Sequence, residues 1–595
     1  MKILFVMIRE ENIDPLNIQL LSALAKEEGH ETFLNVLEHG DLDRDLATIR
    51  PDVIAYSAKT GESNTFFKVN REVRAAWGDR VLSIMGGPHP TFNYQRMRLE
   101  GEELRPKANG DGKRREILPV EETRLDFMAV GEADESWPAL LRALSRNESP
   151  DAIPGIVTRT NRKEDGSIVL GERTNFLDDL PYLDRDIVYD KTQLRFFGMR
   201  THIASRGCPY PCTYCFNARF NQMYKGKGKT INRYSVDRLL AELADLTRRY
   251  PTQFVKFNDD IFVFRVDDWL LEFAEKYPKV VGRPFHCLTR CDLVRKSPEI
   301  VDVLKKAGLH SIYMSIESGN DFIRKHVMKR GMSEEDIRFA FDYCRKRGVH
   351  TFSNTILGVP TPRIPPSGDP EFGRKAAELV THIEEHFRVP TAELRAALAA
   401  DGAATAAGRD ALTEQLRALG LRHTDLEYEL ESLDINVTCR VSAGEFATLY
   451  PFPGAPITQY TIDTGAFDGD FETLNESFQS GSPFSCFSER EKMEQINVSY
   501  LGPVLLVFPF LRNFAVKHLV RRPLTKLYFL AYFFVRAFLM GRRIYPLRYS
   551  WSQLFARVKA SFAREVAKRF PERAKKRKKF LLAPASNMLG GPWKG

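Results

Sequence analysis

Apolar segments of strand length alternate with amphipathic helical segments in this chain, and that alternation restricts it to an α/β fold. Residues 1–147 contain five such segments, at Ile3–Ile8, Thr32–Val36, Val53–Ser57, Val81–Met85 and Asp126–Val130. Fully apolar strands separated by amphipathic helices are typical of a parallel sheet covered on both faces. Residues 1–150 are therefore expected to form a flavodoxin-like doubly wound domain whose ligand binds at the carboxyl ends of the strands.

A second series of the same kind follows a linker at residues 151–195. Its expected strands are His202–Ser205, Phe254–Phe257, Pro284–Leu288, Ser311–Ile316, Thr351–Ile356 and Leu433–Cys439. Six strand–helix units predict a partial (β/α)6 barrel over residues 196–460, with its working face at the loops that follow the strands. Residues 361–425 are expected to form a helical insertion, with a disordered linker as the alternative. Residues 98–123 interrupt the first domain as a surface insertion.

The charge of the chain is concentrated near its C-terminus. The formal net charge is +9, yet Leu511–Phe580 holds 20 Lys and Arg against two Glu, so the rest of the chain is net negative. Residues 461–595 are expected to be mainly helical, aromatic and basic. The longest apolar run there, Leu527–Val535, is nine residues, too short to span a bilayer. Three interpretations stay open for this region: peripheral contact with a membrane, a helical domain that caps the barrel, and, as the least favoured, binding of nucleic acid.

Cysteine use and the N-terminus both point to a reducing compartment. MKILFVMIRE has neither a basic leader nor a long apolar core, so we expect a cytoplasmic protein, with the inner membrane face as a further option. Three of the eight cysteines, Cys208, Cys212 and Cys215, crowd into eight positions directly after the first expected barrel strand. In such a compartment this spacing indicates a metal centre rather than disulfides.

The C-x3-C-x2-C spacing favours an iron–sulfur cluster over zinc. Three thiolates can hold three irons of a cubane and leave the fourth iron open. Structural zinc requires a fourth protein ligand, and no second Cys-x-x-Cys is present in the sequence.

Arg206–Phe216, with its three cysteines, resembles the cluster loop of the radical S-adenosylmethionine (SAM) enzymes. The resemblance implies a [4Fe-4S] cluster that binds SAM and cleaves it reductively to a 5′-deoxyadenosyl radical, with an electron donor such as flavodoxin or ferredoxin. It also implies SAM contacts at successive strand ends: Tyr214, Phe216, Asn258, Asp259, Asp260, Glu317, Ser318 and Gly358. Arg290 follows the third strand as a carboxylate clamp, with a surface salt bridge as the alternative.

The first domain resembles the cobalamin-binding domain of B12-dependent radical SAM enzymes. The resemblance rests on Pro51–Ser57, Met85–Thr91 and Val130–Glu132 and implies the following cobalamin contacts: Tyr56, Ser57, Thr60, Gly61, Gly86, Gly87, Pro88, His89, Gly131 and Glu132. Small residues after strands let a nucleotide tail lie beside the sheet. The loop Arg9–Asp14 has no histidine, so we expect no cobalt ligand from it and a dimethylbenzimidazole tail buried in the domain. We expect His89 to shape its loop rather than to bind cobalt.

Together these resemblances imply methyl transfer through methylcobalamin to an unactivated carbon of a small-molecule or lipid-like substrate. The alternative is a cyclase of the anaerobic tetrapyrrole type that uses the same cofactors without methyl transfer. A third hypothesis is a non-catalytic scaffold that keeps the cluster only as a structural element.

Overall fold

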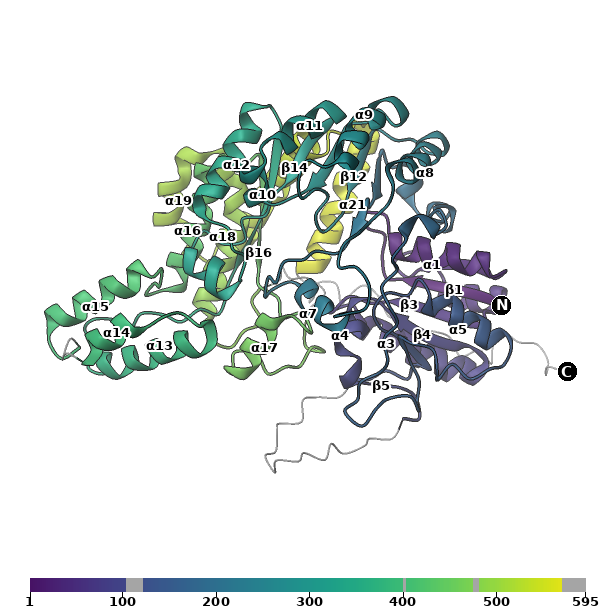
Figure 1. The fold of residues 1–595 in the computed structure, drawn as a ribbon, viewed down its shortest axis with the longest axis horizontal. Helices are drawn as coiled ribbons and strands as arrows, with labels where there is room; N and C mark the ends of the chain where they lie inside the picture. Colours follow the sequence, from purple (N-terminus) through teal and green to yellow (C-terminus); the bar gives the residue numbers. More distant parts are fainter. Residues whose placement is uncertain (103–120, 400–402, 475–480, 550, 570–595) are drawn as a thin grey trace.

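Two parallel sheets organise the molecule, and each has its helices packed around it (Figure 1). The computed structural model describes residues 1–102, 121–399, 403–474, 481–549 and 551–569. Figure 1 shows the first sheet and its helices at one end of the long axis, the barrel beside it, and a helical arm at the other end. Most of the predicted surface insertion at 98–123 lies outside the described residues; its flanks, β5 (Met97–Arg98) and β6 (Glu121–Glu122), pair with each other.

The first sheet confirms the predicted doubly wound domain and extends it by one strand. Its strands are β1 (Lys2–Met7), β2 (Glu31–Val36), β3 (Val53–Ser57), β4 (Leu82–Gly86), β7 (Phe127–Ala129) and β8 (Ile156–Val157), in the order β2-β1-β3-β4-β7-β8. The first five are parallel and have the flavodoxin-like order. β8 comes from the expected linker and pairs antiparallel with β7.

Alternate residues of the central strands face two separate cores. The helices of this domain are α1 (Leu16–Glu27), α2 (Leu42–Ile49), α3 (Ser63–Trp77), α4 (Pro88–Asn93) and α5 (Ser136–Ser145). Ile3 and Phe5 pack with residues of α1 and α5, whereas Leu4 and Val6 pack with residues of α2 and α3. Both faces of the sheet are therefore covered, which leaves the carboxyl ends of the strands as the place for a ligand.

The second sheet is an open barrel of six parallel strands. They are β9 (Met199–His202), β12 (Phe254–Phe257), β13 (Phe285–Leu288), β14 (Leu309–Tyr313), β15 (His350–Leu357) and β16 (Ala443–Thr448), ordered from β9 at one edge to β16 at the other. The covering helices are α8 (Val236–Arg249), α9 (Asp268–Val280), α10 (Cys291–Lys296), α11 (Glu299–Ala307), α12 (Glu334–Lys346) and α16 (Asp425–Thr438). In the part of the chain that is described, β9 and β16 do not pair, so the barrel is partial.

The predicted sixth strand is wrong. Leu433–Cys439 lies in and directly after α16, which begins at a capping box formed by Thr424 and Glu427. The true strand is the small-residue segment Ala443–Thr448, whose low β-propensity hides it. Small residues are needed because a helix passes close by: a Cβ on Gly444 would lie 2.9 Å from the Leu506 side chain. The first strand also begins three residues earlier than predicted, at Met199.

The insertion between β15 and β16 is helical, and over its described residues the disordered-linker alternative is wrong. It contains α13 (Phe372–Phe387), α14 (Ala392–Ala397) and α15 (Ala406–Ala418) and projects away from the barrel as an arm (Figure 1). Phe372, Ile383 and Leu416 belong to a core that the arm shares with the edge of the barrel, so the arm is packed rather than loosely tethered.

The C-terminal region is helical and packs on the barrel. α17 (Pro456–Asp463) is followed by α18 (Glu489–Val507), α19 (Arg512–His518), α20 (Thr525–Leu539) and α21 (Trp551–Arg569). The segment after α20 closes the amino ends of the strands: the Arg543 carbonyl lies 3.0 Å from His310 Nε2, and the Ile544 carbonyl accepts from Ser311 Oγ at 2.8 Å. Among the described helices, none is long and apolar enough to cross a membrane. The basic run at 575–579 lies outside the described residues.

Candidate active site

The three clustered cysteines lie on one loop at the mouth of the barrel, between β10 (Ser205–Arg206) and α7 (Phe216–Met223). Cys215 is the N-cap of α7. Gly207 opens the loop with φ +94°, and a Cβ there would lie 1.9 Å from the Thr230 carbonyl, so only glycine fits. Thr213 fixes the far side of the loop through its N–H and hydroxyl, which donate to the carbonyls of Met328 (3.0 Å) and Val327 (2.7 Å).

Burial keeps two of the three thiols protonated at neutral pH when no metal is bound. Burial raises the pKa of Cys208 to about 11 and that of Cys215 to about 12, so both need a bound metal to lose their protons at neutral pH. Among the described residues, no three His, Cys, Asp or Glu side chains are placed to hold a single metal ion. A cubane takes each thiolate on a different iron, so three thiols on one loop can bind it without converging on a single ion.

Arg290 lies beside the cysteines in a buried ion pair. Its Nε is 2.9 Å from Asp292 Oδ1, its Nη1 is 4.0 Å from Cys212 Sγ, and its guanidinium carbon is 3.6 Å from the centre of the Tyr210 ring. Arg290 is buried, which contradicts the surface salt bridge offered as its alternative role. The structure thus holds a fixed positive charge next to the cluster loop.

A hydrogen-bonded triad joins the cluster loop to the fourth strand. Tyr214 donates its hydroxyl hydrogen to Glu317 Oε1 at 2.8 Å and accepts from Arg330 Nη1 at 2.6 Å. Arg330 also lies 3.5 Å from Glu317. Glu317 has φ +66°, an uncommon conformation for a residue with a side chain, so its backbone is held in a special geometry at the strand end.

The three polar residues after β12 have different roles. Asn258 and Asp260 are exposed at the mouth, and Asp260 is close enough to raise the pKa values of Cys208 and Cys215 further. Asp259 is buried; its Oδ1 accepts from Ala204 N at 3.0 Å and from Ser205 Oγ at 2.6 Å. Asp259 therefore supports the start of the cluster loop and has little carboxylate surface left for a ligand.

Gly358, directly after β15, contacts a buried pair of acidic side chains, Asp425 and Glu429. Its N–H donates to Glu429 Oε1 at 2.6 Å, and Gln495 Nε2 donates to Asp425 Oδ2 at 2.8 Å. A Cβ on Gly358 would lie 2.8 Å from Gln495 Oε1, and its φ of +63° also favours glycine. Burial raises the pKa of Asp425 to about 6 and raises that of Glu429 as well.

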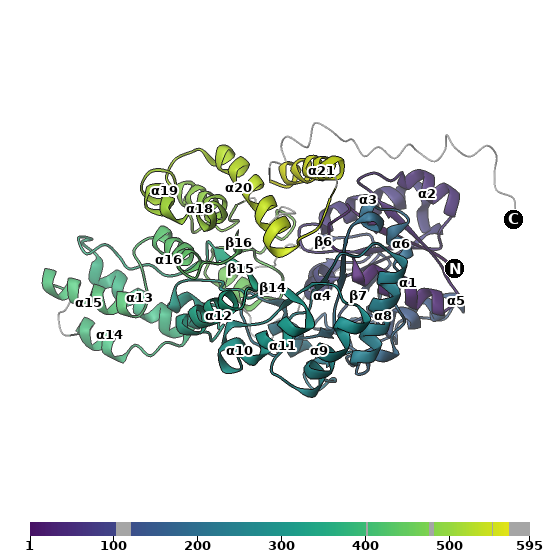
Figure 2. The same cartoon turned by 90° about the horizontal axis from the view of Figure 1, so that it is seen from above.

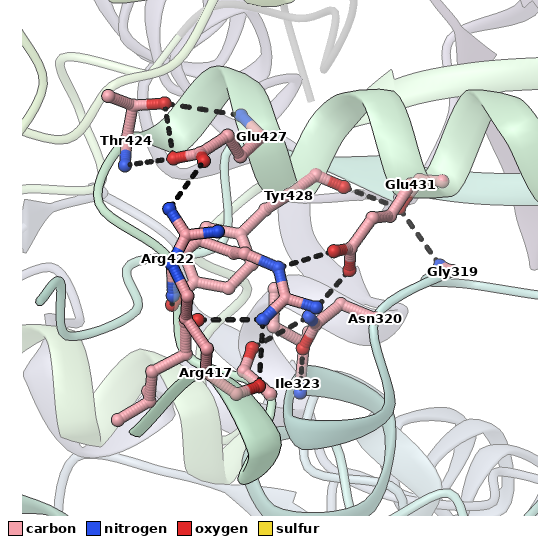
Figure 3. Close-up of polar contacts among 12 residues, drawn as sticks. Gly319, Asn320, Ile323, Arg417, Arg422, Thr424, Glu427, Tyr428 and Glu431 are labelled. Atoms are coloured by element: carbon pink, nitrogen blue, oxygen red, sulfur yellow. Dashed lines mark hydrogen bonds and ion pairs between the residues drawn. The ribbon is translucent and has the colours of Figure 1, made fainter. Parts of the chain in front are cut away.

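The loop after β14 is fastened to the base of the insertion (Figure 3). Asn320 donates through Nδ2 to the Gly420 carbonyl at 2.8 Å and to Glu431 Oε2 at 2.7 Å, and Arg422 also bonds to Glu431. Ser318, one of the predicted SAM contacts, is buried and accepts from Asn320 N at 3.2 Å. The insertion therefore supports the strand end that carries Glu317 and Ser318.

A largely apolar cavity of about 300 Å³ lies at the carboxyl ends of the first sheet. Six of the residues predicted to contact cobalamin line it: Tyr56, Ser57, Gly86, Gly87, Gly131 and Glu132. The barrel closes it with His202, Ile203, Arg206 and Tyr234. An apolar space of this size with a few polar groups at its edge suits a flat aromatic base.

Two glycines that line this cavity have no room for a side chain. Gly87 has φ +100°, and a Cβ there would lie 2.8 Å from the Ala58 carbonyl. Gly131 has φ +88°, and a Cβ there would lie 2.0 Å from the Tyr224 hydroxyl, which accepts from Glu132 N at 2.9 Å. Burial raises the pKa of Glu132.

The other predicted cobalamin contacts lie around the α4 loop. His89 is fully buried, with Nδ1 3.2 Å from Thr60 Oγ1, so its ring holds this loop together. Pro88 is exposed at the start of α4, and Gly61 forms a turn with φ +88° after β3. None of these three lines the 300 Å³ cavity.

The two halves of the site meet where α4 faces α7. The Phe216 ring is 43% exposed and lies 5.9 Å from the Phe92 ring, which is 6.2 Å from Phe220. A Cβ on Gly454 would lie 3.0 Å from Phe92, so the turn at 450–454 reaches the same place. Phe216 thus faces the first domain, on the side of the loop away from the Tyr214 triad.

Comparison with known proteins agrees with this geometry. Residues 203–362 match the family model of the radical SAM superfamily. The chain contains a radical SAM domain.

Relatives and solved structures extend the likeness beyond this radical SAM domain. An uncharacterized methyltransferase of Pyrococcus horikoshii is 23% identical over 58% of this chain and 70% of its own length. The hopanoid C-3 methylase of Methylococcus capsulatus is 23% identical over 62% of this chain and 63% of its own. The solved structure of the cobalamin-dependent SAM radical enzyme OxsB, with aqua-cobalamin and SAM bound, aligns with 96% of this chain and 76% of its own at a TM-score of 0.54 and 16% identity. The described residues therefore share the fold of this cobalamin-dependent radical SAM enzyme, in the first domain as well as in the barrel.

Several residues of the radical SAM domain and of the first-domain cavity were not predicted from the sequence. Arg330 lies in the loop between β14 and α12, a position with no strand-end pattern. Asn17 Nδ2 donates to Ser57 Oγ at 2.5 Å, and Asn17 lines the cavity at the start of α1. Arg206 forms an ion pair with Asp134, and both line the cavity. The only sequence signal for Arg206 was its position just before the first cysteine.

Proposed function

We propose that this protein is a cobalamin-dependent radical SAM methyltransferase that acts on a small-molecule or lipid-like substrate. One observation carries the proposal: the segment that closes the first-domain cavity continues directly into the cysteine loop. Ile203 and Arg206 line the cavity, and Cys208 follows two residues after Arg206. A corrinoid tail in that cavity and a cluster on that loop would therefore be neighbours.

The residues present fit the three groups. Cys208, Cys212 and Cys215 would hold a [4Fe-4S] cluster, and Tyr214, Glu317 and Gly358 lie around the loop where SAM would bind. The apolar cavity and its glycines would take the base of cobalamin. When bound, these groups supply reductive SAM cleavage and a transferable methyl group.

The chain itself contributes charge, orientation and shelter. The buried guanidinium of Arg290 lies beside Cys212, where it would offset part of the negative charge of a thiolate-bound cluster. The hydrogen bonds of the Tyr214–Glu317–Arg330 triad hold the cysteine loop against the end of β14, and SAM would bind beside them. Phe92, Phe216 and Phe220 form an apolar seam between the domains. Such a seam limits the access of water to reactive species formed between them.

The test is an anaerobic reconstitution of the full chain with iron, sulfide, hydroxocobalamin and SAM under a low-potential reductant. We expect bound iron and sulfide, bound cobalamin, and 5′-deoxyadenosine from cleaved SAM. Cys212→Ala should lose the cluster and SAM cleavage, while Cys344→Ala, which changes a buried cysteine of α12, should keep both. SAM cleavage that survives Cys212→Ala would refute the proposal.

A ring-forming cyclase with the same cofactors is the second candidate. The two relatives described above, from Pyrococcus horikoshii and Methylococcus capsulatus, are named for methyl transfer, which favours the methyltransferase. With a competent substrate, methyl transfer would yield S-adenosylhomocysteine together with 5′-deoxyadenosine, whereas cyclisation would yield 5′-deoxyadenosine without S-adenosylhomocysteine.

We also propose that a flavodoxin or ferredoxin supplies the electron and that the enzyme works at the cytoplasmic face of a membrane. A cluster that cleaves SAM needs a one-electron donor from outside the chain. Reduction of the reconstituted protein by flavodoxin and its reductase, measured as 5′-deoxyadenosine formation without dithionite, tests the donor.

A further inference from the structure

The C-terminal helices carry a long segment without acidic residues. Residues 495–564 contain twelve Lys and Arg and no Asp or Glu. The segment includes most of α18, all of α19 and α20, and the first part of α21. The remainder of the chain is mildly acidic. The positive charge is therefore a property of these 70 residues and not of the protein as a whole.

The same segment exposes large apolar side chains. Along α20, Leu527, Leu530, Phe534 and Phe538 are exposed at helical spacing, with Leu527 at 59% and Phe534 at 61%. The opposite side of the helix is already packed: Phe529 and Phe533 lie against Phe562 of α21. The exposed stripe is therefore not needed to hold α20 in place.

Neighbouring helices add to this stripe. Exposed apolar side chains are also found in the turn before α19, in α19 itself and in the first turns of α21: Phe508, Phe510, Leu511, Phe514, Trp551, Leu554 and Phe555. Figure 2 shows α19, α20 and α21 along one side of the molecule, as its outer layer over the barrel and the first domain. These exposed side chains of the outer helices are here together called the C-terminal face.

Exposed cations border this face. They are Lys517, Arg522, Lys526, Arg542 and Lys559. Apolar patches of this extent mark interaction sites in soluble proteins. Helices that combine an exposed apolar side with Lys and Arg at its margin lie in the interface of anionic bilayers, where the cations contact headgroups.

We infer that the C-terminal face docks the enzyme on an anionic lipid surface. A second copy of the chain is a poor occupant, because the contact would bring together two helical segments that carry Lys and Arg and no Asp or Glu. The chain's own residues 570–595 are a poor occupant for the same reason, since they hold seven Lys and Arg and one Glu. The partner has to offset the positive charge and also bury the aromatic side chains. An anionic bilayer does both, through its negatively charged headgroups and its apolar interior.

This surface gives the substrate class a physical basis. Docking would hold the barrel beside the bilayer, so a methyl acceptor that resides in lipid would not have to cross water. This consequence rests on the proposed function, whereas the docking itself does not depend on it.

The test is flotation of the full-length protein with vesicles, without cofactors or SAM. Vesicles of phosphatidylcholine with 30% phosphatidylglycerol should carry at least roughly tenfold more protein than pure phosphatidylcholine. Leu527→Glu/Phe534→Glu should reduce flotation by roughly tenfold or more. Leu271→Glu is the matched control, since Leu271 is 50% exposed on α9, on the opposite side of the molecule (Figure 2). It should float like the wild type.

Three results would overturn the inference. The first is equal flotation of the double variant and the wild type. The second is a wild-type dimer that the double variant converts to monomer, with no vesicle binding by either. The third is tight binding of single-stranded nucleic acid with no flotation. Unchanged thermal unfolding and elution volume of the double variant would show that it is folded. Because no SAM chemistry is measured, loss of flotation and failure of the proposed activity are separate results.

Discussion

Asp425 should destabilise the folded enzyme at neutral pH, and Asp425→Asn should stabilise it. Asp425 is 3% exposed, and burial raises its pKa from 3.8 to about 6. A shift of two units corresponds to about 3 kcal/mol against the charged form. The folded state keeps the proton up to about pH 6, while the unfolded chain loses it near pH 4. The contribution of Asp425 to the free energy of unfolding is therefore most favourable below pH 4, falls as the pH rises to 6, and stays low above pH 6.

The substitution changes charge with little change of shape. Asn keeps an oxygen that can accept from Gln495 Nε2, so the hydrogen bond of 2.8 Å can persist. The loss of a negative charge in the first turn of α16 costs about 0.3–1 kcal/mol. The net gain at pH 8 is then about 2 kcal/mol, or roughly 4–8 °C in the unfolding midpoint of a domain of this size.

Differential scanning calorimetry of the full chain at pH 8 and pH 5 measures this gain. The difference between Asp425→Asn and wild type should be largest at pH 8 and shrink at pH 5. Asp434→Asn is the control on the same helix: Asp434 is 42% exposed and 2.6 Å from Arg512, so its change should lower stability slightly or not at all. A lower midpoint for Asp425→Asn at pH 8, with unchanged pH dependence, would mean that Asp425 is charged and paired with an unseen cation, and would refute the reasoning.

Three further predictions concern the site. Gly131→Ala places a Cβ 2.0 Å from the Tyr224 hydroxyl and should reduce cobalamin content after reconstitution while iron content stays unchanged; Gly166→Ala, equally strained at φ +75° but with nothing within 4 Å, should not. Tyr214→Phe removes two hydrogen bonds and should weaken SAM binding by roughly five- to tenfold in calorimetry, and unchanged affinity would exclude the triad from the SAM site. Asn320→Ala should lower the thermal midpoint by the equivalent of about 1–3 kcal/mol and speed proteolysis of the insertion, because the buried Gly420 carbonyl and the partly buried Glu431 carboxylate lose a donor.

The sequence predicted the architecture well where strands are apolar and failed where packing demands small residues. The runs at Ile3–Ile8 and Val53–Ser57 signal buried strands directly. Ala443–Thr448 does not signal a strand, because close packing restricts it to small residues. Gly444 lies against Leu506, and a Cβ on Gly502 of the neighbouring helix would lie 2.5 Å from Phe446. That close approach is a property of the assembled helix and sheet, and no local pattern in the strand reveals it.

The candidate site was predictable where one segment carries several functional residues. The cysteine loop has a fixed spacing within eleven residues, and the cavity glycines follow strands whose order the rhythm implied. Arg330 and Asn17 reach the site from positions without a pattern, so their roles depend on three-dimensional contacts alone. Asp259 shows the opposite case, because it matches the strand-end pattern while its carboxylate binds Ala204 and Ser205.

The loop after β1 explains how the first domain is held without a cobalt-binding histidine there. Asp14 ends that loop, and its carboxylate accepts from Thr201 N at 2.7 Å and from the Tyr189 hydroxyl at 2.6 Å, with Arg185 at 3.5 Å. A loop fastened in this way to the first barrel strand is not free to reach a metal at the mouth of the cavity. Thr201 directly precedes His202 and Ile203, which line the cavity. The hydrogen bond from Thr201 N to Asp14 therefore also helps to position these two residues. The loop thus positions the barrel against the cavity, and any corrinoid there must be held by the cavity itself.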